Sequence, residues 1–127
     1  MALVLIIDDS PTEVHVLKSM VEKNGFDTAT AASGEIGLSK AKDLKPDLIL
    51  MDIVMPGVNG FQATRQLRND PTTAGIPVIM VSTKDQATDR MWGLRQGAVD
   101  YLVKPVEEKT LLSKMRAVLA SPAEGVQ

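Results

Sequence analysis

Short apolar runs alternate with longer segments of helical spacing along nearly the whole chain. Residues 3–7, 47–51, 78–81 and 101–103 have the length and apolar character of buried strands, and a segment with helical periodicity follows each. A more polar run, 27–31, stands where the alternation requires another strand, and its polarity favours a position at a sheet edge. Five strand–helix units therefore predict an α/β fold with a parallel sheet.

Local signals mark where several helices begin and end. Residues 10–13 (Ser-Pro-Thr-Glu) combine an N-cap serine, a first-turn proline and a capping-box glutamate, while Asn24-Gly25 supplies a stop. Asn59 and Gln62 form a second capping box, and Glu107 and Glu108 suit the positive end of the last helix. That helix has a predicted buried stripe of Leu111, Met115, Val118 and Leu119.

Right-handed crossovers with helices on both faces predict a flavodoxin-like, doubly wound five-stranded parallel sheet of order 2-1-3-4-5 with five helices. In such sheets, ligands bind beyond the carboxyl ends of the strands, near the switch point between the first and third strands. We expect residues 1–120 to form one domain and residues 121–127 to be a flexible tail, with no second domain.

Composition excludes several classes of function. Charged residues make up 24% of the 127 residues and the net charge is only −2, so the chain lacks the broad basic field that attracts nucleic acid or anionic lipid. There are no cysteines, which excludes disulfides, thiolate metal sites and cysteine nucleophiles. The apolar run 2–7 is too short for a signal peptide or a membrane span. We expect a soluble cytoplasmic protein.

Carboxylates follow two of the predicted central strands. Asp8 and Asp9 come after the first strand and Asp52 after the third, so the fold would bring three like charges together. A hard divalent cation would relieve their repulsion, and Mg²⁺ (with Mn²⁺ as the alternative) prefers such oxygen ligands. The backbone carbonyl of Val54 is a candidate fourth ligand.

Hydroxyl and amine groups follow the other two apolar strands. Ser82 and Thr83 end the fourth strand and Lys104 ends the fifth, where they could hold phosphoryl oxygens. A carboxylate can attack phosphorus to give an aspartyl phosphate while nearby cations neutralise the transferred charge. The residue set predicts phosphoryl transfer with Asp52 as the nucleophile.

The same residues resemble the response-regulator receiver domains of the CheY-like superfamily. The resemblance covers nearly the whole chain, and its marks are the pair Asp8-Asp9, the segment 52–57 (DIVMPG), Ser82 after 77–81 (PVIMV), and Lys104-Pro105. It implies that a histidine kinase donates a phosphoryl group to Asp52 and that the Lys104-Pro105 bond is cis.

The resemblance also implies a switch. In receivers the hydroxyl residue moves toward the phosphoryl group and an aromatic residue on the fifth strand turns inward, roles that fall here to Ser82 and Tyr101. Phosphorylation would shift the packing of the fourth helix, fifth strand and fifth helix, and a downstream protein effector would bind that face. Candidate contact residues there are Lys84, Arg90, Trp92 and Arg95. We expect a monomer.

A narrower likeness, carried by 52–67 (DIVMPGVNGFQATRQL), 83–86 and Trp92-Gly93, is to single-domain receivers that serve chemotaxis-like control of type IV pilus twitching motility. The chain would then be an output messenger or a phosphate sink. Many receivers have alanine or glycine at the position of Thr83, so we expect a changed lifetime of the phosphoryl group here.

Three other functions compete with this interpretation. A phosphatase of the haloacid dehalogenase type needs a second acid two residues after the nucleophile, where Val54 stands. A flavodoxin-like electron carrier needs a Ser/Thr/Gly-rich loop that cradles phosphate, and this sequence has none. Asp8 and Asp9 would also repel a flavin phosphate. A phosphate-independent docking module is disfavoured by the complete residue set. We expect no enzyme beyond self-directed phosphotransfer and slow autodephosphorylation. We expect His15, the only histidine, to be a surface or partly packed residue rather than a phosphodonor.

Overall fold

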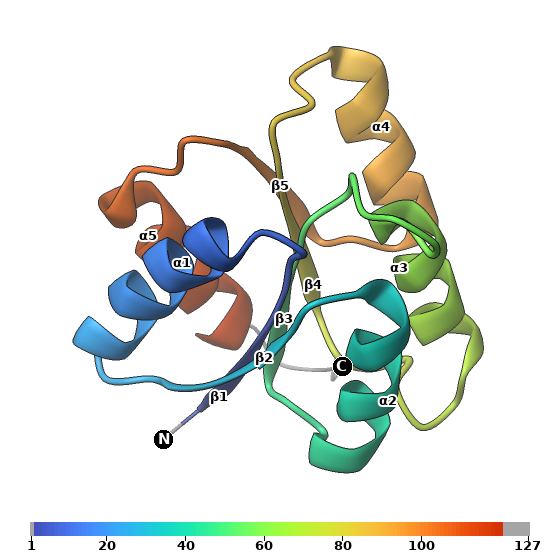
Figure 1. The fold of residues 1–127 in the computed structure, drawn as a ribbon, viewed down its shortest axis with the longest axis horizontal. Helices are drawn as coiled ribbons and strands as arrows, with labels where there is room; N and C mark the ends of the chain where they lie inside the picture. The colour runs from blue at the N-terminus through green and yellow to red at the C-terminus, as the bar shows by residue number, and fades with distance from the viewer. Residues whose placement is uncertain (1, 121–127) are drawn as a thin grey trace.

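The structure is a computed structural model that describes residues 2–120, so the predicted tail at 121–127 lies outside it. A central sheet lies between two layers of helices (Figure 1). The strands are β1 (Leu3–Ile7), β2 (Asp27–Ala31), β3 (Leu48–Met51), β4 (Val78–Ser82) and β5 (Asp100–Val103), and the helices are α1 (Pro11–Lys23), α2 (Gly34–Leu44), α3 (Gly60–Asn69), α4 (Ala87–Gln96) and α5 (Glu108–Ala120). Each predicted strand is present within one residue of its predicted limits.

The sheet has the predicted order β2-β1-β3-β4-β5, and all neighbouring strands are parallel. The polar strand β2 lies at one edge, as its composition indicated. Asp47, just before β3, fixes the alignment with β1: its N–H donates to the Leu3 carbonyl at 2.9 Å and its Oδ2 accepts from the Leu3 N–H at 2.7 Å. The central strands are therefore held at their amino ends as well as along the ladder.

Each face of the sheet packs against its own helices (Figure 1). Helices α1 and α5 cover the face that carries Val4 and Ile6, whereas α2, α3 and α4 cover the face that carries Leu5 and Ile7. The strict alternation along β1 follows from the two-residue period of a strand, and burial on both faces explains why β1, β3 and β4 are almost wholly apolar.

The predicted stripe of α5 is correct but incomplete. Leu111 and Met115 are fully buried, while Val118 and Leu119 are only partly buried against the same core. Leu112, which the stripe omitted, is also buried. Two adjacent buried positions widen the apolar face of the helix beyond a single row, as expected for a helix that packs on a sheet and on another helix together.

The capping predictions are confirmed for α3 and only half confirmed for α1. In α3, Asn59 and Gln62 exchange both capping-box hydrogen bonds. In α1, Ser10 Oγ accepts from the Glu13 N–H at 3.3 Å, but the Ser10 N–H donates to Oδ1 of Asp8 at 2.9 Å instead of to Glu13. The box is incomplete because Asp8, only two residues away, takes the donor that Glu13 would have used.

One arginine ties the carboxyl end of α4 to the loop before β4. The partly buried guanidinium of Arg68 donates to the carbonyls of Gly97 at 3.1 Å, Ala74 at 2.7 Å and Ile76 at 2.5 Å. Gly97 ends α4 with a φ of 113°, and a Cβ there would come within 2.4 Å of the Arg68 side chain.

Among residues 2–120, no helix combines the length and apolar character that crossing a bilayer requires.

Candidate functional site

The three predicted carboxylates meet at the carboxyl ends of β1 and β3. One oxygen from each of Asp8, Asp9 and Asp52 lies within 4.8 Å of the others. Asp8 and Asp52 are buried and Asp9 is exposed. Sheet bonds fix the two buried residues, because the Asp8 N–H donates to Ala31 at 3.0 Å and the Asp52 N–H to Ile7 at 2.9 Å. The backbone of the sheet therefore holds the two buried carboxylates in place. All the potential ligand atoms of the cluster are hard oxygens.

Lys104 brings a positive charge into this cluster from the end of β5. Its Nζ lies 2.8 Å from Asp8 Oδ2 and 3.3 Å from Asp52 Oδ1, and its side chain is only 8% exposed. The predicted cis bond between Lys104 and Pro105 is present. Glu13, which the sequence suggested only as a capping residue, places Oε1 3.9 Å from the same Nζ. The half-formed box of α1 therefore leaves Glu13 at the rim of the site.

Burial and charge perturb the groups at the centre. Burial raises the pKa of Asp52, and the nearby Asp8 carboxylate raises it further, while Lys104 opposes both effects. For Lys104, burial favours the neutral amine, but hydrogen bonds and charges from Asp8 and Asp52 outweigh it and raise its pKa. A bound cation would stabilise the charged form of Asp52 against both its burial and its repulsion from Asp8.

Gly60 allows the amino end of α3 to approach the loop that carries Asp52. A Cβ at this position would lie 2.1 Å from the Asp52 carbonyl oxygen and 2.8 Å from Ile53 Cα, both of which are backbone atoms. The Gly60 N–H also donates to the Ile53 carbonyl at 2.9 Å. The two glycines after β3 have different roles. Gly57 adopts a turn conformation, with a φ of 75°, whereas Gly60 is the first residue of α3 and is needed for close approach.

The hydroxyl residues differ in their positions. Ser82 is completely buried at the end of β4, and its Oγ accepts a hydrogen bond from the Lys84 N–H at 3.2 Å. Thr83 is exposed, as is Lys84, whose Nζ lies 3.7 Å from Asp89. The expected effect of Thr83 on the lifetime of a phosphoryl group stays a prediction.

Tyr101 points inward. The residue is 2% exposed, and its hydroxyl donates to the Lys84 carbonyl at 2.7 Å. Burial raises the pKa of this phenol. Arg90 donates from Nη1 to the Tyr101 carbonyl at 3.2 Å and places its guanidinium carbon 5.3 Å from the ring centroid.

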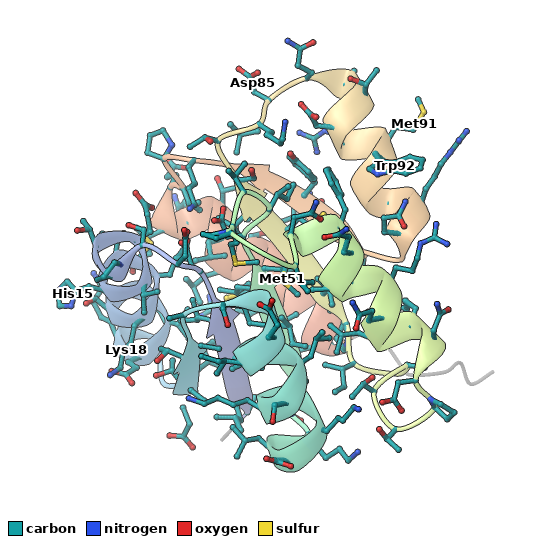
Figure 2. All side chains as sticks on the ribbon, turned by 45° about the vertical axis from the view of Figure 1, so that its right-hand side comes forward. His15, Lys18, Met51, Asp85, Met91 and Trp92 are labelled. Atoms are coloured by element: carbon teal, nitrogen blue, oxygen red, sulfur yellow. The ribbon has the colours of Figure 1, made fainter. Side chains whose placement is uncertain are left out.

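The remaining predicted residues lie at the surface. Val54 is 59% exposed in the loop after β3, beside the buried Asp52 and Met55. Trp92 is 47% exposed and projects from the outer side of α4 together with Met91 (Figure 2). Arg90 and Arg95 on the same helix are exposed. His15 is exposed on α1, far from α4 in this view, as expected for a surface histidine (Figure 2).

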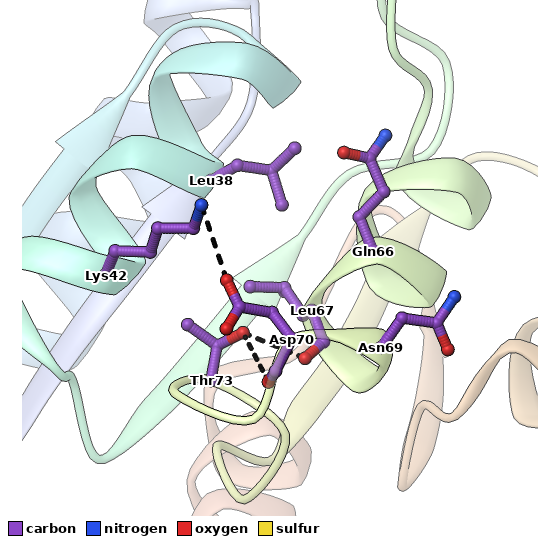
Figure 3. Close-up of a pocket in the computed structure, with 7 residues that line it drawn as sticks. All are labelled: Leu38, Lys42, Gln66, Leu67, Asn69, Asp70 and Thr73. Atoms are coloured by element: carbon purple, nitrogen blue, oxygen red, sulfur yellow. Dashed lines mark hydrogen bonds and ion pairs between the residues drawn. The ribbon is translucent and has the colours of Figure 1, made fainter.

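Two pockets show where the surface is hollowed. One of about 180 Å³ borders Asp8, Asp9 and Thr30, so it opens directly beside the carboxylates. Another, of about 280 Å³, lies between α2 and α3, where Lys42 and Asp70 form an ion pair of 3.3 Å (Figure 3). Asp70 caps the carboxyl end of α3. This second pocket therefore lies toward the amino ends of the strands, at the end of the sheet opposite to the carboxylates.

Comparison with known proteins agrees with this geometry, since residues 4–116 match the family described as the response regulator receiver domain. The chain belongs to this family. Receivers are signalling regulators of two-component systems rather than classical enzymes, and they bind Mg²⁺ at an acidic pocket. Asp8, Asp9 and Asp52 form an acidic cluster in this chain.

The chain is similar to three known proteins in sequence or in fold. Protein PilH of Pseudomonas aeruginosa is 60% identical over 94% of this chain and 99% of its own length. The Vibrio cholerae chemotaxis protein CheY4 has a TM-score of 0.87 at 31% identity, covering 93% of this chain and 98% of its own. The receiver domain of a sensor histidine kinase from P. aeruginosa, solved with a magnesium ion coordinated in the active site cleft, has a TM-score of 0.88 at 28% identity, covering 94% and 98%.

Proposed function

We propose that this receiver accepts a phosphoryl group from a histidine kinase on Asp52 and passes the signal to another protein through the face formed by α4, β5 and α5. The observation that carries the proposal is the joint position of three carboxylates and one buried lysine at the ends of β1, β3 and β5. Burying charged groups costs free energy of folding, so a buried cluster of this kind points to a role other than stability.

The donor set fits a hard divalent cation. Asp8, Asp9 and Asp52 bring three carboxylates against the single amine of Lys104, and burial, followed by the nearby Asp8, raises the pKa of Asp52. We propose that these three carboxylates and the Val54 carbonyl hold Mg²⁺, with Mn²⁺ as a substitute. When bound, the metal supplies charge neutralisation for the transferred phosphoryl oxygens.

The residues of this chain account for the rest of the transfer. A carboxylate oxygen of Asp52 would bond to phosphorus as the bond from phosphorus to the histidine nitrogen of the kinase breaks, and that nitrogen keeps the electron pair and takes up a proton. Lys104, already 3.3 Å from Asp52, would hold a phosphoryl oxygen. The buried Ser82 hydroxyl would hold another, exchanging its bond with the Lys84 N–H for one with the phosphoryl group.

The output is a population shift on the side of α4. Ser82 and Tyr101 both bond to the backbone of Lys84, so movement of the Ser82 hydroxyl acts on the loop that also holds the Tyr101 ring. A protein effector would bind the exposed side chains there, with Trp92 as the anchor and Lys84, Arg90 and Arg95 around it. The likeness to PilH supports a place in the control of type IV pilus twitching motility.

Phosphorylation is tested by incubating the protein with acetyl phosphate and Mg²⁺ and measuring intact mass. The parent chain should gain the mass of one phosphoryl group, and chelation of the metal should abolish the gain. Asp52→Asn should show none, whereas Asp43→Asn, which changes an exposed carboxylate on α2, should label like the parent. Labelling that survives Asp52→Asn would exclude Asp52 as the acceptor.

A further inference from the structure

Arg90 contacts both the backbone and the ring of Tyr101. Its Nη1 donates to the Tyr101 carbonyl at 3.2 Å, which tethers the guanidinium to β5, and its Cζ lies 5.3 Å from the centre of the ring. A guanidinium within about 6 Å of an aromatic face is attracted by the ring quadrupole. Arg90 is exposed whereas Tyr101 is buried, so the arginine is the solvent-accessible partner of this pair.

Two further contacts define the space that the ring fills. The hydroxyl donates to the Lys84 carbonyl, in the loop before α4. Gly93, one turn after Arg90, lies against the ring, because a Cβ there would come within 3.3 Å of Tyr101 Cδ2 and 2.6 Å of Met80 Sδ. Helix α4 and its preceding loop thus contact the ring at its hydroxyl, at Cδ2 and, through Arg90, over its face.

We propose that Arg90 is a positioning residue that holds Tyr101 inward before any phosphoryl transfer, so that this receiver is biased toward the inward state of its switch. The inference rests on the proposed function of Tyr101. Turning the ring outward would remove it from under the guanidinium and break its bond to Lys84, so each contact adds to the free energy of the inward state. A bias of this kind reduces the further change that phosphorylation can produce.

The chain suits a direct test because Tyr101 is its only tyrosine. Biosynthetic incorporation of 3-fluorotyrosine gives a single ¹⁹F NMR signal, and its shift between H₂O and D₂O reports how far the ring is exposed. The measurement uses the full chain with no phosphodonor present. Arg90→Ala removes both contacts, and Arg95→Ala is the matched control, since it removes the same charge from the same helix about 140° around its axis.

In the parent and in Arg95→Ala, we expect the signal of a shielded ring. Arg90→Ala should lower the ratio of inward to outward ring by about fivefold, the loss of one cation–π contact, and move the signal toward that of the urea-unfolded chain. Arg90→Lys keeps the charge but lacks the fork that bonds to the carbonyl while covering the ring, so it should fall between the two.

Equal ring exposure in the parent and in folded Arg90→Ala, judged by far-UV circular dichroism, would overturn the inference, as would full rescue by Arg90→Lys. Because no phosphodonor is used, the result does not depend on Asp52. Failure of Asp52 to label with acetyl phosphate would instead overturn the proposed function, and the inference that Arg90 positions Tyr101 would still hold.

Discussion

The Nζ of Lys104 lies 2.8 Å from Oδ2 of Asp8, although the two residues are 96 positions apart in the chain. Both side chains are less than a tenth exposed. Lys104→Met keeps most of the side-chain volume but leaves the buried carboxylates without their cation. We expect it to lower the free energy of unfolding at neutral pH by about 3 kcal/mol in the presence of a chelator.

Urea denaturation with and without Mg²⁺ checks this, because the metal should restore part of the loss by binding the native state alone. Lys114→Met is the control, since it breaks a 3.3 Å pair with Asp100 between side chains that are 46% and 26% exposed, a pair worth less than about 1 kcal/mol. Equal losses in the two variants would show that the Lys104 pair is no stronger than a surface pair.

Asp52→Asn should stabilise the metal-free protein. Burial and the Asp8 carboxylate raise the pKa of Asp52, so its charge opposes folding at neutral pH, and the neutral amide removes that cost. We expect a gain of about 1 kcal/mol in thermal or urea unfolding with chelator present. Addition of Mg²⁺ should stabilise the parent more than the variant, which has lost a ligand. A parent and variant of equal stability in chelator would contradict the electrostatic account of the site.

Tyr101 gives the protein a defined alkaline sensitivity. Its pKa is raised by burial, so over the pH range above about 10 the native state holds the phenol proton more tightly than the unfolded state. The free energy of unfolding must then fall as pH rises through that range. Tyr101→Phe should remove this part of the slope and cost about 1 kcal/mol at neutral pH through loss of the bond to Lys84.

The titration can be followed by tyrosinate absorbance in native and urea-unfolded protein, and the single tyrosine makes the signal unambiguous. A phenol that ionises at the same pH in both states would be incompatible with the buried position.

Gly60→Ala should damage the site from outside it. The new Cβ would overlap the Asp52 carbonyl and Ile53 Cα, and backbone atoms cannot move aside as a flexible side chain can. We expect a loss of more than about 2 kcal/mol and slower labelling of Asp52 by acetyl phosphate. Gly75→Ala is the matched control, because a Cβ there has no heavy atom within 4 Å outside its chain neighbours, and it should label at the parent rate.

Arg68→Ala should destabilise the fold without touching the carboxylates. Its guanidinium donates to carbonyls of Gly97, Ala74 and Ile76, and the alanine leaves these acceptors without their donor, including the two in the partly buried bonds to Gly97 and Ile76. We expect a loss of about 3 kcal/mol in urea unfolding. Arg116→Ala, an exposed arginine on α5, should change stability by less than about 0.5 kcal/mol.

The sequence predicted the sheet and the cluster because both depend on short-range patterns. Strand-length apolar runs fix the order of elements, and parallel strands necessarily bring Asp8, Asp52 and Lys104 to the same edge. The contacts of the long arginine side chains could not be predicted from such patterns. The bonds from Arg68 to three carbonyls and the stacking of Arg90 on Tyr101 join segments whose spacing in the chain carries no periodic signal.

The position of Gly60 shows the same limit at the backbone. The capping box of Asn59 and Gln62 already indicated that α3 begins here, but the close approach of Gly60 to the Asp52 carbonyl depends on the three-dimensional path of the loop. The capping box of α1 is only half confirmed, for a related reason. Asp8 competes locally for the Ser10 N–H, and a pattern that spans residues 10–13 does not include that competitor.

The Arg68 bond to the Gly97 carbonyl gives α4 one fixed end. Its carboxyl end is anchored to α3 and the loop before β4, whereas its amino end is joined to the site through the Lys84 backbone. In the proposed switch, a helix held in this way would pivot about Gly97. A small shift of the Ser82 hydroxyl would therefore produce its largest displacement at the amino end of α4 and very little at the hinge.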